Sequence, residues 1–119
     1  MRAGRLIVPK MPSRPAVLLS VQRALLGNVP ASLRAVACGW TERAITLRSI
    51  FDGPVSAELA DAMRAVGSEV IADFPAPTTI DEQILRIDWP AGLEDRALQA
   101  WAYRRKEARR SGDRCAKEA

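Results

Sequence analysis

Apolar side chains recur along this chain with two different periods, and the changes of period divide it into elements. From Ala16 to Leu26 they return every three or four residues, which predicts an amphipathic helix. Pro15 fits the first turn of that helix, and Gly27 fits its end. The first element is therefore expected to be a helix over Ala16–Leu26.

A second helical stripe lies in the middle of the chain. Its apolar side chains step by three or four residues from Leu59 to Phe74, and Ser56 is placed to cap the N-terminus. Gly67 interrupts the stripe, and a glycine there costs about 1 kcal/mol relative to alanine. The alternative is a break at Gly67 followed by a strand over Glu69–Phe74. Because the stripe keeps its phase across Gly67, we predict a single helix.

Four other segments alternate apolar and polar side chains with a period of two, which is typical of strands. The first two are joined by a short polar connection and predict an antiparallel hairpin. A helix is the alternative for the last segment, but a strand there supplies a hairpin partner for the segment before it. The predicted strands lie within Leu33–Trp40, Ala44–Phe51, Ile80–Trp89 and Gln99–Lys106.

The resulting order of elements, α-β-β-α-β-β, predicts an α+β fold. Its economical arrangement is a two-layer sandwich, in which both helices cover one face of a four-stranded, mainly antiparallel sheet. The other face of such a sheet stays uncovered and can meet water or a partner. We expect a single domain over residues 15–107, a flexible N-terminal extension over residues 1–14 and a basic C-terminal tail over residues 108–119.

The composition is that of an ordinary globular domain, with 48% hydrophobic and 27% charged residues in a chain of 119. No run approaches the roughly 18 apolar residues of a membrane span. The apolar stretch Leu6-Ile7-Val8 is too short for a secretory signal. These features predict a cytoplasmic protein that does not associate with membranes. Two cysteines indicate no disulfide framework, and Cys38 is expected to be a small core residue.

Candidate catalytic and metal-binding groups are few. The chain has no histidine, and its two cysteines cannot form a closed zinc site. Its seven glycines form no phosphate-binding loop. The adjacent acids Asp81-Glu82 and Glu94-Asp95 would point to opposite sides of a strand. We therefore predict a non-catalytic protein with no cofactor and no metal site.

Charge is strongly segregated along the chain. Residues 1–51 carry eight basic side chains and one acid, and residues 52–95 carry two basic side chains and ten acids. Residues 96–119 carry eight basic side chains and three acids. The formal net charge of +4 hides these opposing blocks. Because ordinary surfaces intersperse the two signs, the segregation favours a role in binding.

Two groups of charged residues are candidate binding sites. At about 100° per residue, four acids of the second helix share one exposed face, which is either a solvated surface or a landing site for a basic protein. They are Glu58, Asp61, Glu69 and Asp73. Near the C-terminus, basic groups interleave with aromatic ones and either solubilise the tail or bind phosphates and stack bases. That group comprises Trp101, Tyr103, Arg104, Arg105 and Lys106.

A family resemblance is carried by five segments of the chain. They are LLSVQRALLG at 18–27, LRAV at 33–36, FDG at 51–53, EVIADFP at 69–75 and ILRID at 84–88. In this combination the chain resembles a group of small bacterial αββαββ proteins, over residues 18–106. That group is associated with the immunity proteins of contact-dependent growth inhibition and related toxin systems.

The resemblance implies an inhibitor of a cognate toxin. Many such toxins act on nucleic acids through basic clefts, so an acidic face could cover the cleft and exclude the substrate. On this hypothesis the four helix acids make the contact, together with Asp52 and Asp88. Two alternatives stay open. One is a small RNA-binding protein that uses Trp101–Arg110, and the other is a homodimer that pairs acidic and basic blocks between subunits.

Overall fold

The hydrophobic periods are followed closely by the elements of the computed structural model, which describes residues 12–108. Their order is α-β-β-α-β-β, as predicted, and the first two strands have the predicted bounds. The elements are α1 (Arg14–Leu25), β1 (Leu33–Trp40), β2 (Ala44–Phe51), α2 (Ala57–Ala72), β3 (Thr79–Arg86), a short 3-10 helix η2 (Glu94–Arg96) and β4 (Ala100–Arg104).

Both helices begin at a serine. The Ser13 hydroxyl accepts a hydrogen bond from the Ala16 N–H at the start of α1, and the Ser56 hydroxyl accepts one from the Leu59 N–H at the start of α2. After α1, Gly27 adopts a positive φ of 77°, which a glycine tolerates without strain. The helix α2 runs without a break, so the alternative of a strand over 69–74 is wrong.

Gly67 is explained by the packing of α2 on the sheet. A Cβ atom at this position would overlap the carboxylate of Glu82, which reaches across from β3. The glycine therefore leaves room for the Glu82 side chain, and the helical stripe continues through it.

The pairing of the last two strands differs from the prediction. The strand order is β3-β2-β1-β4, so β3 and β4 lie at opposite edges of the sheet and form no hairpin. β4 pairs antiparallel with β1, β1 pairs antiparallel with β2 as predicted, and β3 pairs parallel with β2. Because α2 carries the chain back along the sheet before β3 begins, β3 runs in the same direction as β2. The sheet is thus mixed but mostly antiparallel, in agreement with the predicted fold class.

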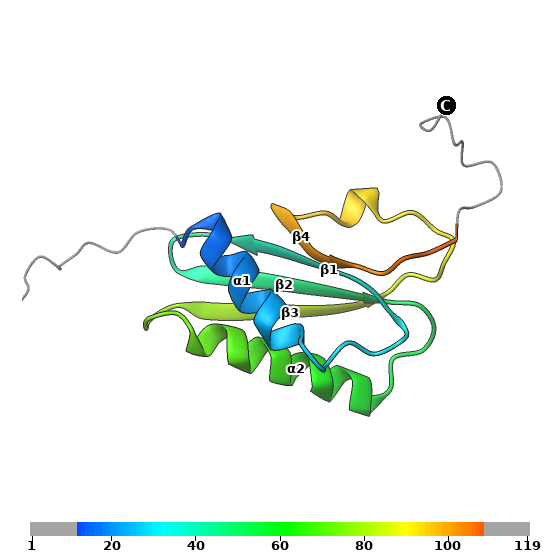
Figure 1. Ribbon diagram of the computed structural model, residues 1–119, viewed down its shortest axis with the longest axis horizontal. Helices are drawn as coiled ribbons and strands as arrows, with labels where there is room; N and C mark the ends of the chain where they lie inside the picture. Colours follow the sequence, from blue (N-terminus) through cyan, green and yellow to red (C-terminus); the bar gives the residue numbers. More distant parts are fainter. Residues whose placement is uncertain (1–11, 109–119) are drawn as a thin grey trace, which may run out of the picture.

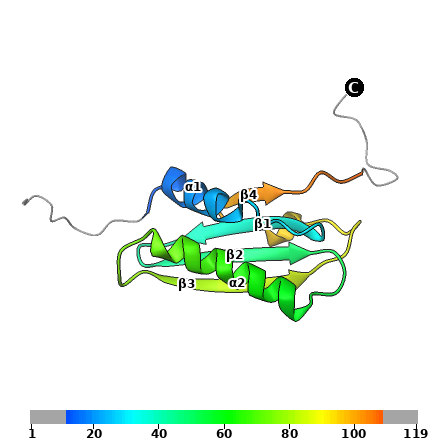
Figure 2. The ribbon, with the colours of Figure 1, turned by 60° about the horizontal axis from the view of Figure 1, so that its bottom comes forward.

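The two helices lie side by side on one face of the sheet (Figure 1). Figure 2 shows α2 across β2 and β3, and α1 beside β1 and β4. One core fills the space between the layers, and Cys38 is part of it, as predicted. Its largest fully buried side chains are Phe51, Leu33, Ile45, Val17, Val21, Val36 and Val70.

The opposite face of the sheet is not left open at its centre, contrary to the prediction. The connection from β3 to β4, residues 87–99, must pass from one edge to the other, and it does so across this face. Leu93 packs there against Ala35 and Ile50, and both of these strand residues are fully buried. Part of this face is therefore closed to a partner.

Candidate partner-binding surfaces

The charge blocks of the sequence fall on different elements of the fold. α2 and β3, which adjoin each other at one edge, carry five acids and two arginines. α1, β1 and β4, toward the other edge, carry four arginines and no acid. The order of the strands places the acidic elements on one side and the basic elements on the other. The acidic and basic side chains therefore lie mainly on different elements, although α1 and α2 pack side by side on one face of the sheet and Arg23 of α1 pairs with Asp73.

The six acids predicted to bind a partner do not form a single free surface. Four of them already have a basic partner within the described chain, at distances that define ion pairs. The pairs are Asp61 with Arg64, Asp73 with Arg23, Asp88 with Arg86 and Asp52 with Arg105. These four acids are thus partly neutralised by the protein itself.

Asp73 fastens the two helices together. It follows the last residue of α2 and accepts hydrogen bonds from the Ser20 hydroxyl at 2.6 Å and from Arg23 at 2.9 Å, both on α1. The hydrogen bond from Ser20 is the main cause that lowers the pKa of Asp73, and Arg23 adds to it. Asp73 is therefore a structural link as well as a surface charge.

Asp52 and Asp88 join the ends of β2 and β3. Asp88 accepts the Gly53 N–H at 2.7 Å, and Asp52 accepts the Trp89 N–H at 3.3 Å. The hydrogen bond from Arg86 is the main cause that lowers the pKa of Asp88, followed by the one from Gly53. These hydrogen bonds stabilise the chain reversals after β2 and β3, so both acids have a structural role.

Glu58 and Glu69 are the two exposed acids of the predicted set that make no ion pair with any residue of 12–108. Glu58 lies in the first turn of α2. Glu69 lies near its end and lines a hollow of about 250 Å³ between the helices, together with Ser20, Arg23 and Asp73. Of the predicted acids, these two are the most available to a basic partner.

The aromatic residues proposed for nucleic-acid binding lie on opposite faces of the sheet. A bulge in β4 shifts the register between Val36 and Ala37, so that Tyr103 lies opposite Val36 and Trp101 opposite Ala37. Tyr103 packs against the core under the helices, whereas Trp101 packs on the other face, where the Arg104 guanidinium lies 4.8 Å from its ring centroid. The two rings do not form one platform for stacking bases.

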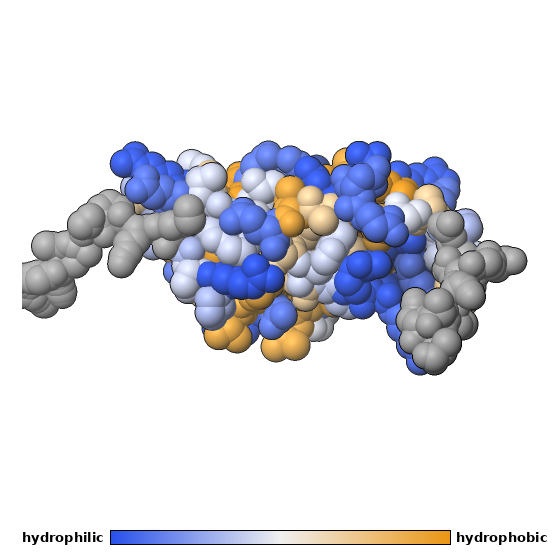
Figure 3. All heavy atoms as spheres, turned by 90° about the horizontal axis from the view of Figure 1, so that it is seen from above, coloured by the Kyte–Doolittle hydropathy of each residue, from blue (hydrophilic) through white to orange (hydrophobic). Residues whose placement is uncertain are grey.

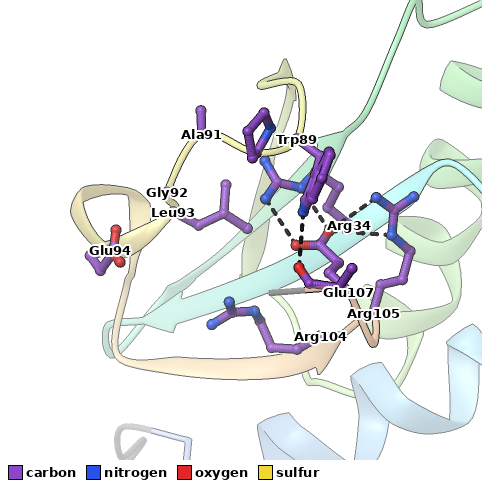
Figure 4. Close-up of a pocket in the computed structure, with 11 residues that line it drawn as sticks. Arg34, Trp89, Ala91, Gly92, Leu93, Glu94, Arg104, Arg105 and Glu107 are labelled. Carbon is purple, nitrogen blue, oxygen red and sulfur yellow. Dashed lines mark hydrogen bonds and ion pairs between the residues drawn. The ribbon is translucent and has the colours of Figure 1, made fainter. Parts of the chain in front are cut away.

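A buried ion-pair network at the end of the sheet was not predicted. Glu107 lies between the guanidinium groups of Arg34 and Arg105, as Figure 4 shows, with Nε of Arg34 at 2.8 Å. The hydrogen bond from Arg34 is the main cause that lowers the pKa of Glu107. The burial of Arg34 was not predicted from the sequence, because arginine side chains are rarely fully buried unless they are paired.

This network borders a hollow of about 390 Å³, lined also by Trp89, Leu93 and Arg104. It is not a ready anion site, since Nε and Nη2 of Arg34 donate to Glu107 and Nη1 donates to the Ile87 carbonyl. Arg105 is likewise paired with Glu107 and Asp52. Of the basic residues predicted to bind nucleic acid, Arg104 and Lys106 remain exposed.

Chemistry of other kinds finds little support in the described residues. Burial raises the pKa of the Cys38 thiol to about 11, so this cysteine is a poor nucleophile. Residues 12–108 contain no group of three or more Cys, Asp or Glu side chains arranged to hold a metal ion. In the same range, no helix is long and apolar enough to span a membrane.

Comparison with known families decides between the remaining classes of function. The model of the MafI2 immunity protein family matches residues 14–107. The chain belongs to this family. MafI2 immunity proteins are non-catalytic and neutralise a cognate MafB toxin. No curated protein matches the chain.

Membership of the MafI2 family confirms the toxin-immunity function that the resemblance implied. It also ranks the surfaces, because an immunity protein acts through a protein partner. The matched span contains both helices, all four strands and Glu107, and it ends before the basic residues from Arg109 onward. The part of the chain that matches the family is therefore the folded domain.

Proposed function

We propose that the protein neutralises its MafB toxin by laying the acidic face of α2 over a basic cleft of the toxin, so that the toxin's substrate is excluded. One observation carries the proposal. Among residues 12–108, Glu58 and Glu69 are exposed and have no ion-pair partner, and the opposite side of their helix is buried. Unpaired charges of one sign steer an oppositely charged partner and set the specificity of association.

The other acids take lesser parts in this proposal. Asp61 and Arg64 form an exposed ion pair, and such pairs contribute little, so Asp61 is able to turn to a partner. Asp73, Asp52 and Asp88 contribute to the negative potential from positions fixed by the fold. Substituting any of these three would disturb the structure as well as the surface. Glu58 and Glu69 are therefore the residues to test.

Two finer points belong to the same proposal. The toxin is delivered by contact-dependent growth inhibition, and this protein acts in the cytoplasm. The first follows from the resemblance of the five segments to immunity proteins of that kind. The second follows from the task of an immunity protein, which must meet the toxin where the toxin finds its substrate. Expression of the toxic domain in the cytoplasm, with and without this protein, would test the compartment.

The electrostatic contact is tested by the double substitution Glu58→Lys and Glu69→Lys. We expect association with the purified toxic domain to slow by about tenfold or more at low salt, and the difference to shrink as salt rises. Both side chains are exposed, so the free energy of unfolding should fall only by about 1 kcal/mol, through the lost interaction of Glu58 with the N-terminus of α2. Association rates from surface plasmon resonance at several salt concentrations provide the measurement.

A matched control is Glu94→Lys with Asp95→Lys, two exposed acids of η2 in the connection that crosses the far face. This variant has the same net charge as the first. We expect it to associate at nearly the rate of the unaltered protein. Equal slowing by both variants would mean that net charge alone matters, and unchanged association of the first would remove α2 from the contact.

A further inference from the structure

The outward side of α1 is unusually apolar. Val17 and Val21 are fully buried against the sheet, whereas Leu19 is 57% exposed and Leu26, just after the helix, is 76% exposed. Seven residues correspond to almost two complete turns, so Leu19 and Leu26 lie on the same side of the helix. In Figure 3, which looks down on the molecule of Figure 1, hydrophobic side chains project at the lower margin, where the helices lie.

Exposed large apolar side chains are few among residues 12–108. Four large apolar side chains are exposed in this range, and three of them, Leu19, Leu26 and Val29, belong to α1 and the turn after it. The fourth, Trp89, is tied into the sheet end through hydrogen bonds from its N–H and its indole nitrogen. Single exposed leucines are ordinary, but a group on one helix side is typical of a protein-binding surface.

The apolar group adjoins the acids of α2. Arg23 lies four residues after Leu19 and three before Leu26, so the three side chains are neighbours on α1. Arg23 in turn lines the hollow between the helices and pairs with Asp73 at 2.9 Å, across from Glu69. The same face of the molecule thus combines exposed apolar side chains with Arg23, with the paired Asp73, and with Glu69, which makes no ion pair among residues 12–108. Protein interfaces have this anatomy, with an apolar centre and a polar rim.

We propose that Leu19, Leu26 and Val29 form the apolar centre of the surface that binds the MafB toxin, and that Glu69 and the neighbouring acids form its rim. The choice of occupant rests on the proposed function and on charge complementarity. A second copy of this chain would bring Glu69 and Asp73 near acids of the same face, whereas a basic toxin cleft would offset them. The apolar centre supplies affinity, and the acids supply steering.

The test compares two double variants of nearly equal shape. Leu19→Gln with Leu26→Gln replaces the apolar surface by a polar one, and Leu19→Met with Leu26→Met keeps it apolar. Glutamine and methionine are similarly good helix formers, so neither pair should unfold α1. We expect the glutamine variant to bind the purified toxic domain about tenfold or more weakly, mainly through faster dissociation, and the methionine variant to bind within about twofold of the unaltered protein.

Three outcomes would overturn the proposal. Equal toxin affinity of the folded glutamine and methionine variants would show that Leu19 and Leu26 lie outside the contact. A change in molecular mass by light scattering, with toxin affinity unaltered, would assign Leu19 and Leu26 to an interface between copies of this chain. A lower unfolding temperature of the glutamine variant, with toxin affinity unaltered, would mean that another part of this chain covers Leu19 and Leu26. Deletion of residues 1–11 would then be the next experiment.

The result is separable from that of the charge reversal. The effect of the glutamine substitutions should persist at high salt, because it arises from lost apolar contact, whereas the effect of Glu58→Lys with Glu69→Lys should fade. Weak binding of the glutamine variant together with normal association of the charge-reversed variant would support the apolar centre and refute the acidic cleft-covering contact.

Discussion

The buried guanidinium of Arg34 connects two segments of the chain, one that follows the edge strand β3 and one that follows the edge strand β4. Arg34 lies in β1, its side chain is 3% exposed, and Nη1 donates to the Ile87 carbonyl just after β3 at 2.7 Å. Its Nε and Nη2 donate to Glu107, which follows β4. A charge buried in this way is tolerated only when it is paired and hydrogen-bonded. The integrity of this end of the sheet therefore depends on Glu107.

Glu107→Ala is expected to lower the free energy of unfolding by about 3–5 kcal/mol, because it leaves Arg34 buried without its counter-ion. Chemical denaturation gives the measurement. Lys106→Ala, at the exposed neighbouring position, is the control and should change stability by less than about 0.5 kcal/mol. Similar costs for the two substitutions would contradict the assignment of the pair as structural.

The same pair makes a prediction about pH. Arg34 lowers the pKa of Glu107 in the folded protein below its ordinary value, so the stabilisation is complete at neutral pH and above the unfolded pKa. It is lost as the pH falls through the folded pKa and Glu107 takes up a proton. The stability difference between the unaltered protein and Glu107→Gln should therefore narrow in acid.

Which acids are free to bind a partner could not be predicted at this scale. The sequence places Glu58, Asp61, Glu69 and Asp73 on one helix and predicts their exposure. The partners of Asp73 are Ser20 and Arg23, which lie some fifty residues earlier in the chain and meet it only through helix packing. Local patterns carry no information about such contacts, so the division into paired and unpaired acids required the fold.

At the scale of elements, the period of the apolar residues predicted whether each segment is a helix or a strand, but it did not predict which strands pair. Both helices and all four strands were predicted because each carries its own apolar pattern. The hairpin of β3 and β4 was wrong, since the pattern within a strand does not name its neighbour. The length of the connection, residues 87–99, is the signal that was missed, because hairpin loops usually have two to five residues.

The packing of α2 on β3 makes a prediction about Gly67. Alanine in a helix interior is favoured over glycine by about 1 kcal/mol, but here its Cβ would overlap the Glu82 carboxylate. We expect Gly67→Ala to yield little or no stabilisation alone and about 1 kcal/mol when combined with Glu82→Ala. A double-mutant cycle of unfolding free energies measures the coupling.

Ala65→Gly, at an exposed position of α2, calibrates the helix propensity and should cost about 1 kcal/mol. If Gly67→Ala changes the free energy of unfolding equally with and without Glu82, position 67 does not contact that side chain. A coupling would confirm that Gly67 leaves room for the Glu82 side chain between α2 and β3.

For the whole molecule, the basic character of the chain and the charge of its folded part are different quantities. Residues 12–108 contain eleven basic and twelve acidic side chains, so they are close to neutral, whereas the whole chain has a formal charge of +4 and an isoelectric point near 9.7. The positive excess belongs to residues 1–11 and 109–119. A high isoelectric point is therefore no argument that the folded domain binds nucleic acid.

This separation predicts that nucleic-acid binding and toxin neutralisation depend on different residues. The full chain should bind RNA weakly and in a salt-sensitive way through its basic ends. Replacing Arg109, Arg110 and Arg114 by glutamine should reduce that binding several-fold and leave the affinity for the toxic domain unchanged. Fluorescence anisotropy with a short single-stranded RNA and binding to the toxic domain, both at the same salt concentration, give the comparison. Loss of toxin affinity in this variant would move the contact from the helical face to the C-terminal tail, against both proposals made for α1 and α2.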